Sequence, residues 1–330
     1  MTIADHPLDH CWYAVATSDA IGDAPVGVEL RATPYVIWRD ADDRPVAAVD
    51  RCSHREARLS LGTVESGGLR CPYHGWKFDG SGRCVEVPSS GEGATIPPAA
   101  HLDPLPVDER YGLVWLCPGE PAQAVPHLDV EDDDMFTRLN TGMQVWNSSA
   151  TRMIDNMLDV AHFPFTHAGT FGREQEQVVP HVSLTQLDDT FHGYEYSVVV
   201  ENEGEAKAMS GGGGDVIGIT MSTGFALPFS VRSTMSYDNG IEQTLFMTAA
   251  PIDRERSHYT FVLWRNDDVT TTGRQIVDFE LEVAKEDRAM LERLSGELPL
   301  DRGALVDVQS DKASLEWRRR YRALVTADET

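Results

Sequence analysis

Two short stretches in the first quarter of the chain have matching contents, Cys52-Ser53-His54 and Cys71-Pro72-Tyr73-His74. Each joins one cysteine to one histidine across a gap of one or two residues. Thiolate sulfur and imidazole nitrogen are both common metal ligands. We therefore expect the fold of this region to bring two loops together around one metal centre with two sulfur and two nitrogen ligands.

This ligand set is that of a Rieske [2Fe–2S] cluster, in which two histidines replace two cysteines on one iron. On that pattern Cys52 and Cys71 bind one iron, and His54 and His74 bind the other. A structural zinc site is the alternative, because two cysteines and two histidines also form a tetrahedral zinc set. Zinc fingers, however, group cysteine with cysteine and histidine with histidine. Since each loop here carries one of each, the order favours the cluster, which transfers single electrons.

The composition limits the classes of protein to which the chain can belong. A length of 330 residues exceeds that of a small electron carrier and predicts a second domain. The net charge of −25 argues against a nucleic-acid partner or an anionic membrane surface. Since no apolar run is long enough to span a bilayer and the start lacks a secretory pattern, we expect a cytoplasmic protein. The remaining cysteines, Cys11, Cys84 and Cys117, are expected to be reduced core residues.

The pattern of strands and turns predicts two domains of different kinds. Residues 1–120 read as short strands with polar turns between them, an all-β domain carrying the cluster loops. Residues 121–140 are acidic and rich in proline at their start and are expected to be a linker. Residues 141–330 read as a helix, a run of strands and further helices, which predicts an α+β domain with an antiparallel sheet. The expected strands are 193–201, 215–225, 229–237, 241–250 and 258–265.

A second metal site is predicted just after the domain boundary. A helix over 151–162 would place Asn156, Asp159 and His162 on one face, because they are three residues apart. Pro164 is expected to break this helix, so that His167 turns back towards His162. On spacing alone, two buried structural histidines are an equal alternative. The redox cluster upstream favours a metal.

An iron that binds O₂ needs open positions, which two histidines and one carboxylate provide. The helix expected over 275–294 has one acid, Asp287, among apolar residues on its inward face. The neighbouring Glu286 has charged residues at helical spacing and is expected to face solvent. An ordinary surface acid or a salt bridge is the alternative for Asp287.

These residues together resemble the Rieske non-haem iron oxygenases, specifically their oxygenase component, over nearly the full length. The resemblance rests on Cys52-x-His54, Cys71-x-x-His74, Asn156-x-x-Asp159-x-x-His162-x₄-His167 and Asp287. The chain is similar in type to vanillate O-demethylase and dicamba monooxygenase. This resemblance implies that residues 141–330 are a catalytic domain of the helix-grip type that holds a mononuclear iron. The stretch Arg55-Glu56-Ala57 departs from the Arg-Gly-Ala sequence that is common there.

The resemblance implies a homotrimer in which one subunit's cluster supplies the iron of the next, with Asp159 between His74 and His162 and Asn156 beside the iron. It implies a ferredoxin, a flavin reductase or both as electron donors, with NAD(P)H used indirectly. No phosphate-binding glycine loop is present in the sequence, which agrees with a separate reductase. The expected reaction is O₂-dependent hydroxylation or demethylation of a small aromatic or cyclic compound.

Two alternatives differ in function. One is a cis-dihydroxylating ring dioxygenase, and the other is an electron-transfer or ligand-binding protein with a vestigial iron site. Substrate contacts are expected among apolar residues near the iron ligands or on the sheet. The candidates are Leu158, Phe163, Phe225, Phe229, Met247, Trp264 and Met290.

Overall fold

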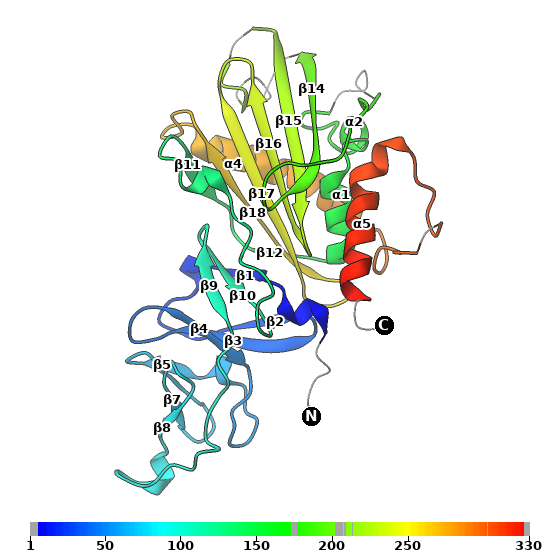
Figure 1. Cartoon of the computed structure of the whole chain (residues 1–330). Helices are drawn as coiled ribbons and strands as arrows, with labels where there is room; N and C mark the ends of the chain where they lie inside the picture. The colour runs from blue at the N-terminus through cyan, green and yellow to red at the C-terminus, as the bar shows by residue number, and fades with distance from the viewer. Residues whose placement is uncertain are drawn as a thin grey trace. The chain divides into compact units, whose positions relative to one another are not determined.

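The computed structural model of the chain divides into two compact units, Met1–Val125 and Pro126–Thr330 (Figure 1). The first unit contains strands and short 3-10 turns, and the α-helices lie in the second, so the predicted α+β class is confirmed. The described residues are 6–172, 177–201, 207, 209–212, 214–301 and 303–326. Among them, no helix has the length and apolar character needed to cross a membrane.

In the first unit, residues 6–125 form three small antiparallel sheets, with the strand orders β1-β10-β9, β2-β3-β4 and β5-β6-β7-β8. Its strands are β1 (Tyr13–Thr17), β2 (Val26–Leu30), β3 (Thr33–Arg39), β4 (Pro45–Val49), β5 (Thr63–Glu65), β6 (Gly68–Arg70), β7 (Lys77–Phe78), β8 (Cys84–Glu86), β9 (Val107–Arg110) and β10 (Leu113–Leu116). One hydrophobic cluster in this unit includes Trp38, Leu69 and Phe78 together with Cys52 and Cys71. The two predicted ligand cysteines are therefore anchored in packed core.

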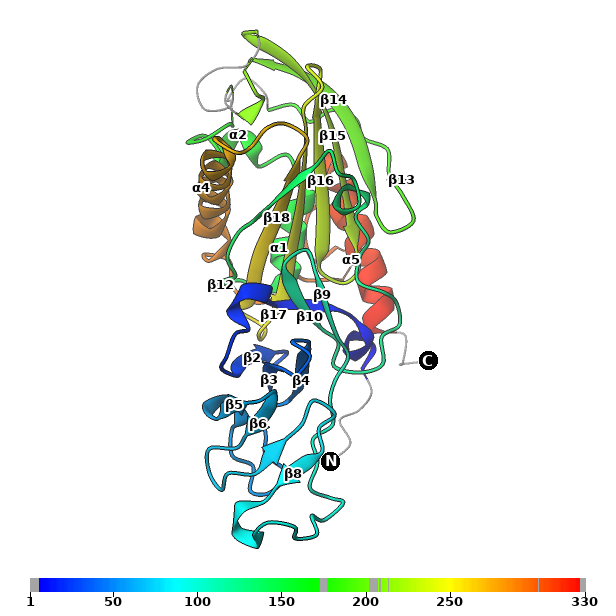
Figure 2. The ribbon, with the colours of Figure 1, turned by 90° about the vertical axis from the view of Figure 1, so that its left-hand side faces the viewer.

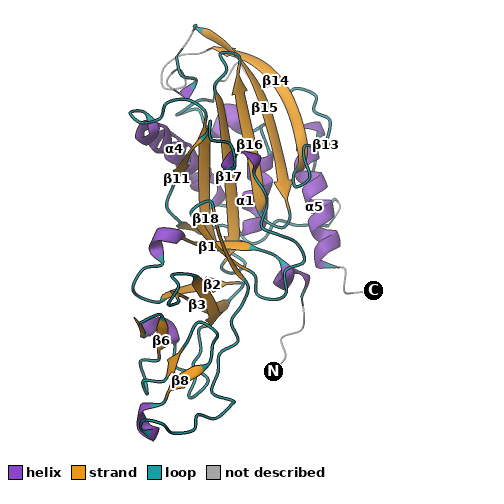
Figure 3. Cartoon of the chain, turned by 60° about the vertical axis from the view of Figure 1, so that its left-hand side comes forward, coloured by secondary structure: helices purple, strands orange, loops and turns teal. Residues whose placement is uncertain are grey.

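The second unit contains one large antiparallel sheet with the order β11-β18-β17-β16-β15-β14-β13, and β12 also pairs with β18. Figure 3 shows its long strands running side by side. The strands are β11 (Thr137–Asn140), β12 (Gln144–Trp146), β13 (Thr185–Gln186), β14 (His192–Glu201), β15 (Val216–Ala226), β16 (Ser230–Tyr237), β17 (Glu242–Pro251) and β18 (Ser257–Arg265). All five strands expected from the sequence are present. Residues 137–140, assigned to a linker from the sequence, instead form β11, because their backbone pairs with β18.

Among the described residues, the α-helices that accompany the sheet are α1 (Ala150–Leu158), α2 (Phe163–Thr166), α4 (Gly273–Leu291) and α5 (Lys312–Val325). Helix α1 packs on β15, β16 and β17 and touches α4 and α5, while α2 touches α4. Figure 2 shows α4 lying alongside the sheet. Side chains alternate between the two faces of a strand, so the face beneath α1 and α4 receives every second residue, as with Ile217, Ile219 and Met221 on β15.

Candidate metal centres

The first Cys-His loop follows β4 and is closed by its own backbone. The N–H of Cys52 donates to the carbonyl of Ala57, and the N–H of Glu56 donates to the carbonyl of Cys52, both at 2.9 Å. Glu56 has a φ of 59°, in the left-handed region that side chains other than glycine rarely adopt. The side chain of Cys52 is 1% exposed, while His54 is half-buried.

The second loop, between β6 and β7, repeats this construction. The N–H of Cys71 donates to the carbonyl of Trp76 at 2.8 Å, and the N–H of Gly75 donates to the carbonyl of Cys71 at 3.1 Å. Gly75 has a φ of 71° and occupies the position that Glu56 holds in the first loop. The two loops are thus the same turn, with glycine at the strained position in only one of them.

The four predicted cluster ligands form two pairs. The rings of His54 and His74 lie with their centroids 4.5 Å apart, and the Cys52 and Cys71 thiols are close enough for Cys71 to raise the pKa of Cys52. Within the part of the chain that the structure describes, no partner hydrogen-bonds the buried Nδ1 of His54. A buried nitrogen without a partner is costly, and a metal ion would satisfy it.

A single ion does not fit these four side chains. In the described chain, only His162, His167 and Asp287 bring three ligand atoms within 4.8 Å of one another. Two separate pairs suit a cluster of two irons better than one tetrahedral zinc. Burial and the neighbouring Cys71 raise the pKa of Cys52 to about 11, so the thiol keeps its proton unless a cation displaces it. Cys11, Cys84 and Cys117 are free and buried, as expected.

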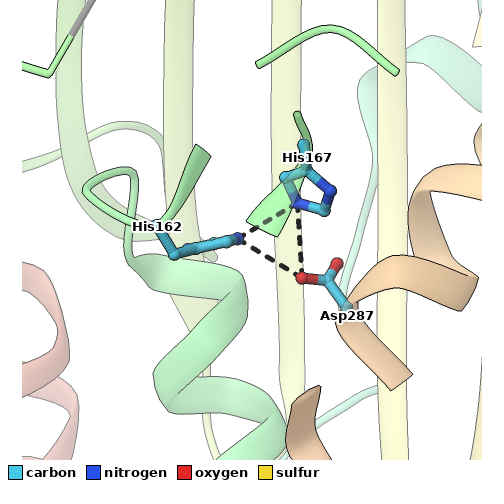
Figure 4. A group of neighbouring side chains, drawn as sticks. All are labelled: His162, His167 and Asp287. Atoms are coloured by element: carbon cyan, nitrogen blue, oxygen red, sulfur yellow. Dashed lines mark hydrogen bonds and ion pairs between the residues drawn. The ribbon is translucent and has the colours of Figure 1, made fainter. Parts of the chain in front are cut away.

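The second group, His162, His167 and Asp287, forms a compact triangle (Figure 4). The two histidine Nε2 atoms are 3.2 Å apart, and each lies 3.3 Å from Oδ1 of Asp287. Two ligands about 2.1 Å from one metal and at right angles lie about 3 Å apart. The spacing therefore matches that of two histidines and one carboxylate on one face of an iron.

Hydrogen bonds on the far side of each ring orient the nitrogens. Nδ1 of His162 lies 3.0 Å from Oδ2 of Asp159, and Nδ1 of His167 lies 3.0 Å from Oε2 of Glu286. An ionised carboxylate only accepts hydrogen bonds, so both Nδ1 atoms carry protons and both Nε2 atoms present lone pairs. Lone pairs and a carboxylate oxygen at 3.2 to 3.3 Å repel one another unless a positive charge lies among them. The group fits a cation.

The pKa shifts of His162 and Asp287 also indicate that this group of side chains attracts positive charge. Burial lowers the pKa of His162, but hydrogen bonds to Asp159 and Asp287 outweigh burial and raise it to about 9. Burial raises the pKa of Asp287, but His162 and His167 outweigh burial and hold it well below its usual range. Nδ2 of Asn156 also donates to Oδ1 of Asp287 at 3.0 Å. Each of the three residues therefore has one supporting polar neighbour.

The helix predicted over 151–162 is shorter than expected. It ends at Leu158, and Asp159 is extended, because its carboxylate accepts the backbone N–H groups of Ala161 at 2.8 Å and His162 at 3.2 Å. Such bonds compete with helical ones. The prediction that Asn156, Asp159 and His162 share one helical face is therefore wrong.

Pro164 also acts differently from the prediction. It lies in the first turn of α2, where a missing N–H costs nothing, so it starts a helix and does not break one. His162 and His167 are the N-cap and C-cap of this single turn, which brings them together. The chain after His167 packs back tightly on α2 at Gly172. Only glycine fits there, because a Cβ would lie 2.1 Å from the carbonyl oxygen of Phe163.

Glu286 is the functional candidate that the sequence reading missed. It was expected to face solvent, yet its Oε2 accepts from Nδ1 of His167 and from the hydroxyl of Thr170, the latter at 2.7 Å. Adjacent residues on a helix point about 100° apart, so helical phase alone placed Glu286 away from the site. Its adjacency to Asp287 was the only available signal.

A cavity of about 470 Å³ opens on the triangle. Its walls come from α1, α2, α4 and the strands β14 to β18, and most of the lining is apolar. Asn156, His162, His167 and Asp287 line it, and so does one further acid, Glu280. A cavity of this size and character suits a small organic molecule.

Two of the seven expected substrate contacts, Phe163 and Met247, line this cavity, and the other five do not. Tyr259 lines the cavity, and Trp264 lies five positions further along β18. Because side chains alternate between the two faces of a strand, an odd offset places Trp264 on the opposite face. Phe229 packs against aromatic rings of α5. Met290 is 46% exposed.

A β unit with two Cys-His loops and a sheet unit with a His-His-Asp triangle over an apolar cavity together define the oxygenase component of Rieske non-haem iron oxygenases. Residues 11–100 match the Rieske [2Fe-2S] domain, and residues 146–327 match the vanillate O-demethylase oxygenase C-terminal domain. Because the second match spans more than half of the chain, the chain belongs to the vanillate O-demethylase oxygenase family. The family and enzyme class predicted from the sequence are confirmed.

Known proteins are similar over most of the chain. The methylxanthine N1-demethylase NdmA of Pseudomonas putida is 29% identical, over 97% of this chain and 90% of the relative. The structure of NdmA with caffeine has a TM-score of 0.85 at 27% identity, covering 98% of this chain and 92% of that one. The dicamba O-demethylase oxygenase component of Stenotrophomonas maltophilia is 32% identical, over 52% of each chain.

Proposed function

We propose that the chain removes a methyl group from nitrogen or oxygen of a small aromatic or cyclic compound, using O₂ and electrons from a ferredoxin or flavin reductase. The observation that carries this proposal is the His-His-Asp triangle opening on an apolar cavity of about 470 Å³. The methylxanthine and dicamba demethylases among the relatives support methyl removal.

The residues present fit two metal groups. Cys52, His54, Cys71 and His74 would hold the [2Fe–2S] cluster, and His162, His167 and Asp287 would hold the mononuclear iron. When bound, the two groups would supply electron storage and the reductive activation of O₂. The overall reaction consumes the methylated compound, O₂, two electrons and two protons, and it yields the demethylated compound, formaldehyde and water.

The protein's own residues fix the protonation and the orientation of the three side chains that would hold the iron. Asp159 and Glu286 hold the proton on Nδ1 of each histidine, which keeps both Nε2 atoms free to bind a metal. The amide of Asn156 holds Oδ1 of Asp287 towards the same point. The apolar walls orient the substrate and limit water, so that reducing equivalents are used on the substrate.

We also propose the head-to-tail homotrimer that the resemblance implies. In it, Asp159 connects His162 to His74 of the partner subunit and passes the electron. The exposed position of the His74 side chain and the 27% exposure of the Asp159 side chain leave both accessible to another subunit.

Oxygen uptake with a surrogate reductase and NADH tests the proposed function. A panel of N-methyl and methoxy aromatic compounds should contain at least one that gives formaldehyde in equal amount to the O₂ consumed. With labelled O₂, two labelled atoms in the organic product would instead indicate cis-dihydroxylation. No uptake by iron-replete protein across the panel would favour the electron-transfer or binding alternative.

A further inference from the structure

The wall of the apolar cavity is unusually rich in methionine. Six of the chain's ten methionines line it, whereas among the described residues only two of the 25 leucines, Leu245 and Leu291, do so. The two side chains are both apolar and of similar size, and leucine holds the better-defined shape. Apolar character alone therefore does not explain why sulfur is concentrated here. The six are Met153, Met157, Met209, Met221, Met235 and Met247.

The methionines lie on two facing sides of the cavity. Met153 and Met157 are four residues apart on α1, so they share one face of the helix. Helix α1 packs on β15, β16 and β17. On these strands Met221 lies directly opposite Met235, and Met247 lies on β17. Thioether sulfurs therefore lie on both the helix side and the sheet side of the cavity that opens on the triangle.

Four of these side chains are open to the cavity. Met153 is 0% exposed and Met209 is 5% exposed, so both are packed within the wall. The other four are half-buried although they lie on packed elements, and the cavity that they line accounts for their exposure. The hydroxyl of Tyr196, which also lines the cavity, donates to Sδ of Met221 at 3.1 Å and keeps that sulfur beside the cavity. The accessible methionines are thus Met157, Met221, Met235 and Met247.

A thioether differs from an aliphatic side chain in its reaction with peroxide. Hydrogen peroxide oxidises methionine to methionine sulfoxide. A sulfur lone pair attacks one peroxide oxygen, so that an S–O bond forms and the O–O bond breaks. The departing hydroxide takes the proton of the transferred oxygen and leaves as water, and the sulfur loses the two electrons that the peroxide gains. The product is polar, so a wall of sulfoxides would bind an apolar compound less well.

Resting on the proposed function, we propose that the four accessible methionines are an oxidative modification site. The oxidant is hydrogen peroxide, which arises in the cavity when O₂ takes up two electrons and two protons with no substrate present. Conversion of the thioethers to sulfoxides makes the cavity wall polar and weakens the binding of apolar substrates. Methionine sulfoxide reductases reverse this chemistry, so the modified state is a switch and not a terminal product.

Turnover without substrate tests where the oxidation falls. Iron-replete protein is given a surrogate reductase, NADH and air, with catalase to destroy peroxide in the surrounding solution. Peptide mass spectrometry should find the accessible methionines oxidised about fivefold more than Met135 and Met290, which lie outside the cavity and are 69% and 46% exposed. If O₂ is consumed and the order is equal or reversed, oxidation follows exposure to solvent and the proposal is overturned.

Peroxide added to metal-free protein needs no O₂ uptake and so separates this proposal from the proposed function. Oxidation should weaken binding of N-phenyl-1-naphthylamine, a probe that fluoresces in apolar cavities, about tenfold. The double variant Met221→Leu/Met235→Leu replaces two neighbouring thioethers by side chains of similar size. It should lose less than about threefold relative to its own untreated sample. The control Met135→Leu/Met290→Leu should lose as much as the wild-type protein.

Two results of the peroxide experiment contradict the proposal. One is an affinity for the probe that oxidation of the wild-type protein leaves unchanged, and the other is an equal loss in Met221→Leu/Met235→Leu. The first result does not require either variant to fold. Absence of O₂ consumption in the turnover experiment would instead refute the proposed function, and the metal-free protein would still decide whether these methionines are a modification site.

Discussion

The two candidate metal centres are encoded in different ways. The cluster loops are local, since each carries its ligands within four residues and closes with backbone bonds between its own ends. The triangle is not local, because His162 and His167 flank one helical turn while Glu286, which supports His167, lies 119 residues further along the chain. The loop centre is therefore readable from spacing, whereas the triangle depends on how α4 packs against α1 and α2.

The largest effect on turnover is expected for Asp287→Ala, which should abolish one metal centre and leave the other intact. Removing one of three ligands should release the mononuclear iron and reduce turnover to background. The visible spectrum of the cluster should be unchanged, because none of its ligands is altered. A variant that loses both the cluster spectrum and the iron would contradict the independence of the two centres.

Asp159→Asn tests the connection between the centres. The amide can still accept from the N–H of Ala161, so the cluster should stay bound and the mononuclear site should lose no more iron affinity than in Glu286→Gln. Loss of the carboxylate should nevertheless reduce turnover of the iron-loaded variant about a hundredfold. Steady-state turnover and iron content are measured together. Asp132→Asn, at a side chain that is 76% exposed, is the control. Near-normal NADH-driven turnover in Asp159→Asn would remove its proposed role.

Glu286→Gln should have a smaller effect on the triangle alone. The carboxylate that holds the proton on Nδ1 of His167 becomes an amide, which should lower iron affinity about tenfold. Equilibrium dialysis against a chelator measures this, with Glu282→Gln as the matched surface control. Equal affinities for the two variants would show that Glu286 does not support the site.

The smallest effect concerns the cluster loops. Glu56→Gly should stabilise the chain by about 1 kcal/mol, because glycine adopts a positive φ without strain. Glu56→Ala keeps the strain and removes only an exposed pair with Arg51, so it should give no gain. Thermal unfolding compares the two. A gain with alanine equal to that with glycine would refute the backbone explanation.

The difference between the local loops and the non-local triangle determines which features could be predicted from the sequence. Cys52, His54, Cys71 and His74 could be proposed as ligands from the sequence, because their order along the chain is unusual and each pair is local. Asp287 was also a predictable candidate, because its neighbours at helical spacing, such as Val283 and Leu291, are apolar; Glu280, which lines the same cavity, was not predicted. The end of α1 was not, because side-chain bonds from Asp159 to the backbone decide it.

The same limit applies to the residues around the triangle. The role of Glu286 depends on which side of α4 meets α2, and that follows from packing between elements far apart in the sequence. Five of the expected substrate contacts do not line the cavity for related reasons. Trp264, for example, lies on the other face of the sheet, because side chains alternate along β18. Local patterns therefore identified the candidate ligands but not the side chains that hydrogen-bond them.

The central claim is that one chain holds two metal centres of different kinds. Counting iron, acid-labile sulfide and zinc in reconstituted protein tests it most directly. The account predicts three iron atoms and two sulfides per chain in the wild-type protein, and two of each in Asp287→Ala. Two irons in the wild-type protein, or zinc in place of iron at the Cys-His loops, would contradict it.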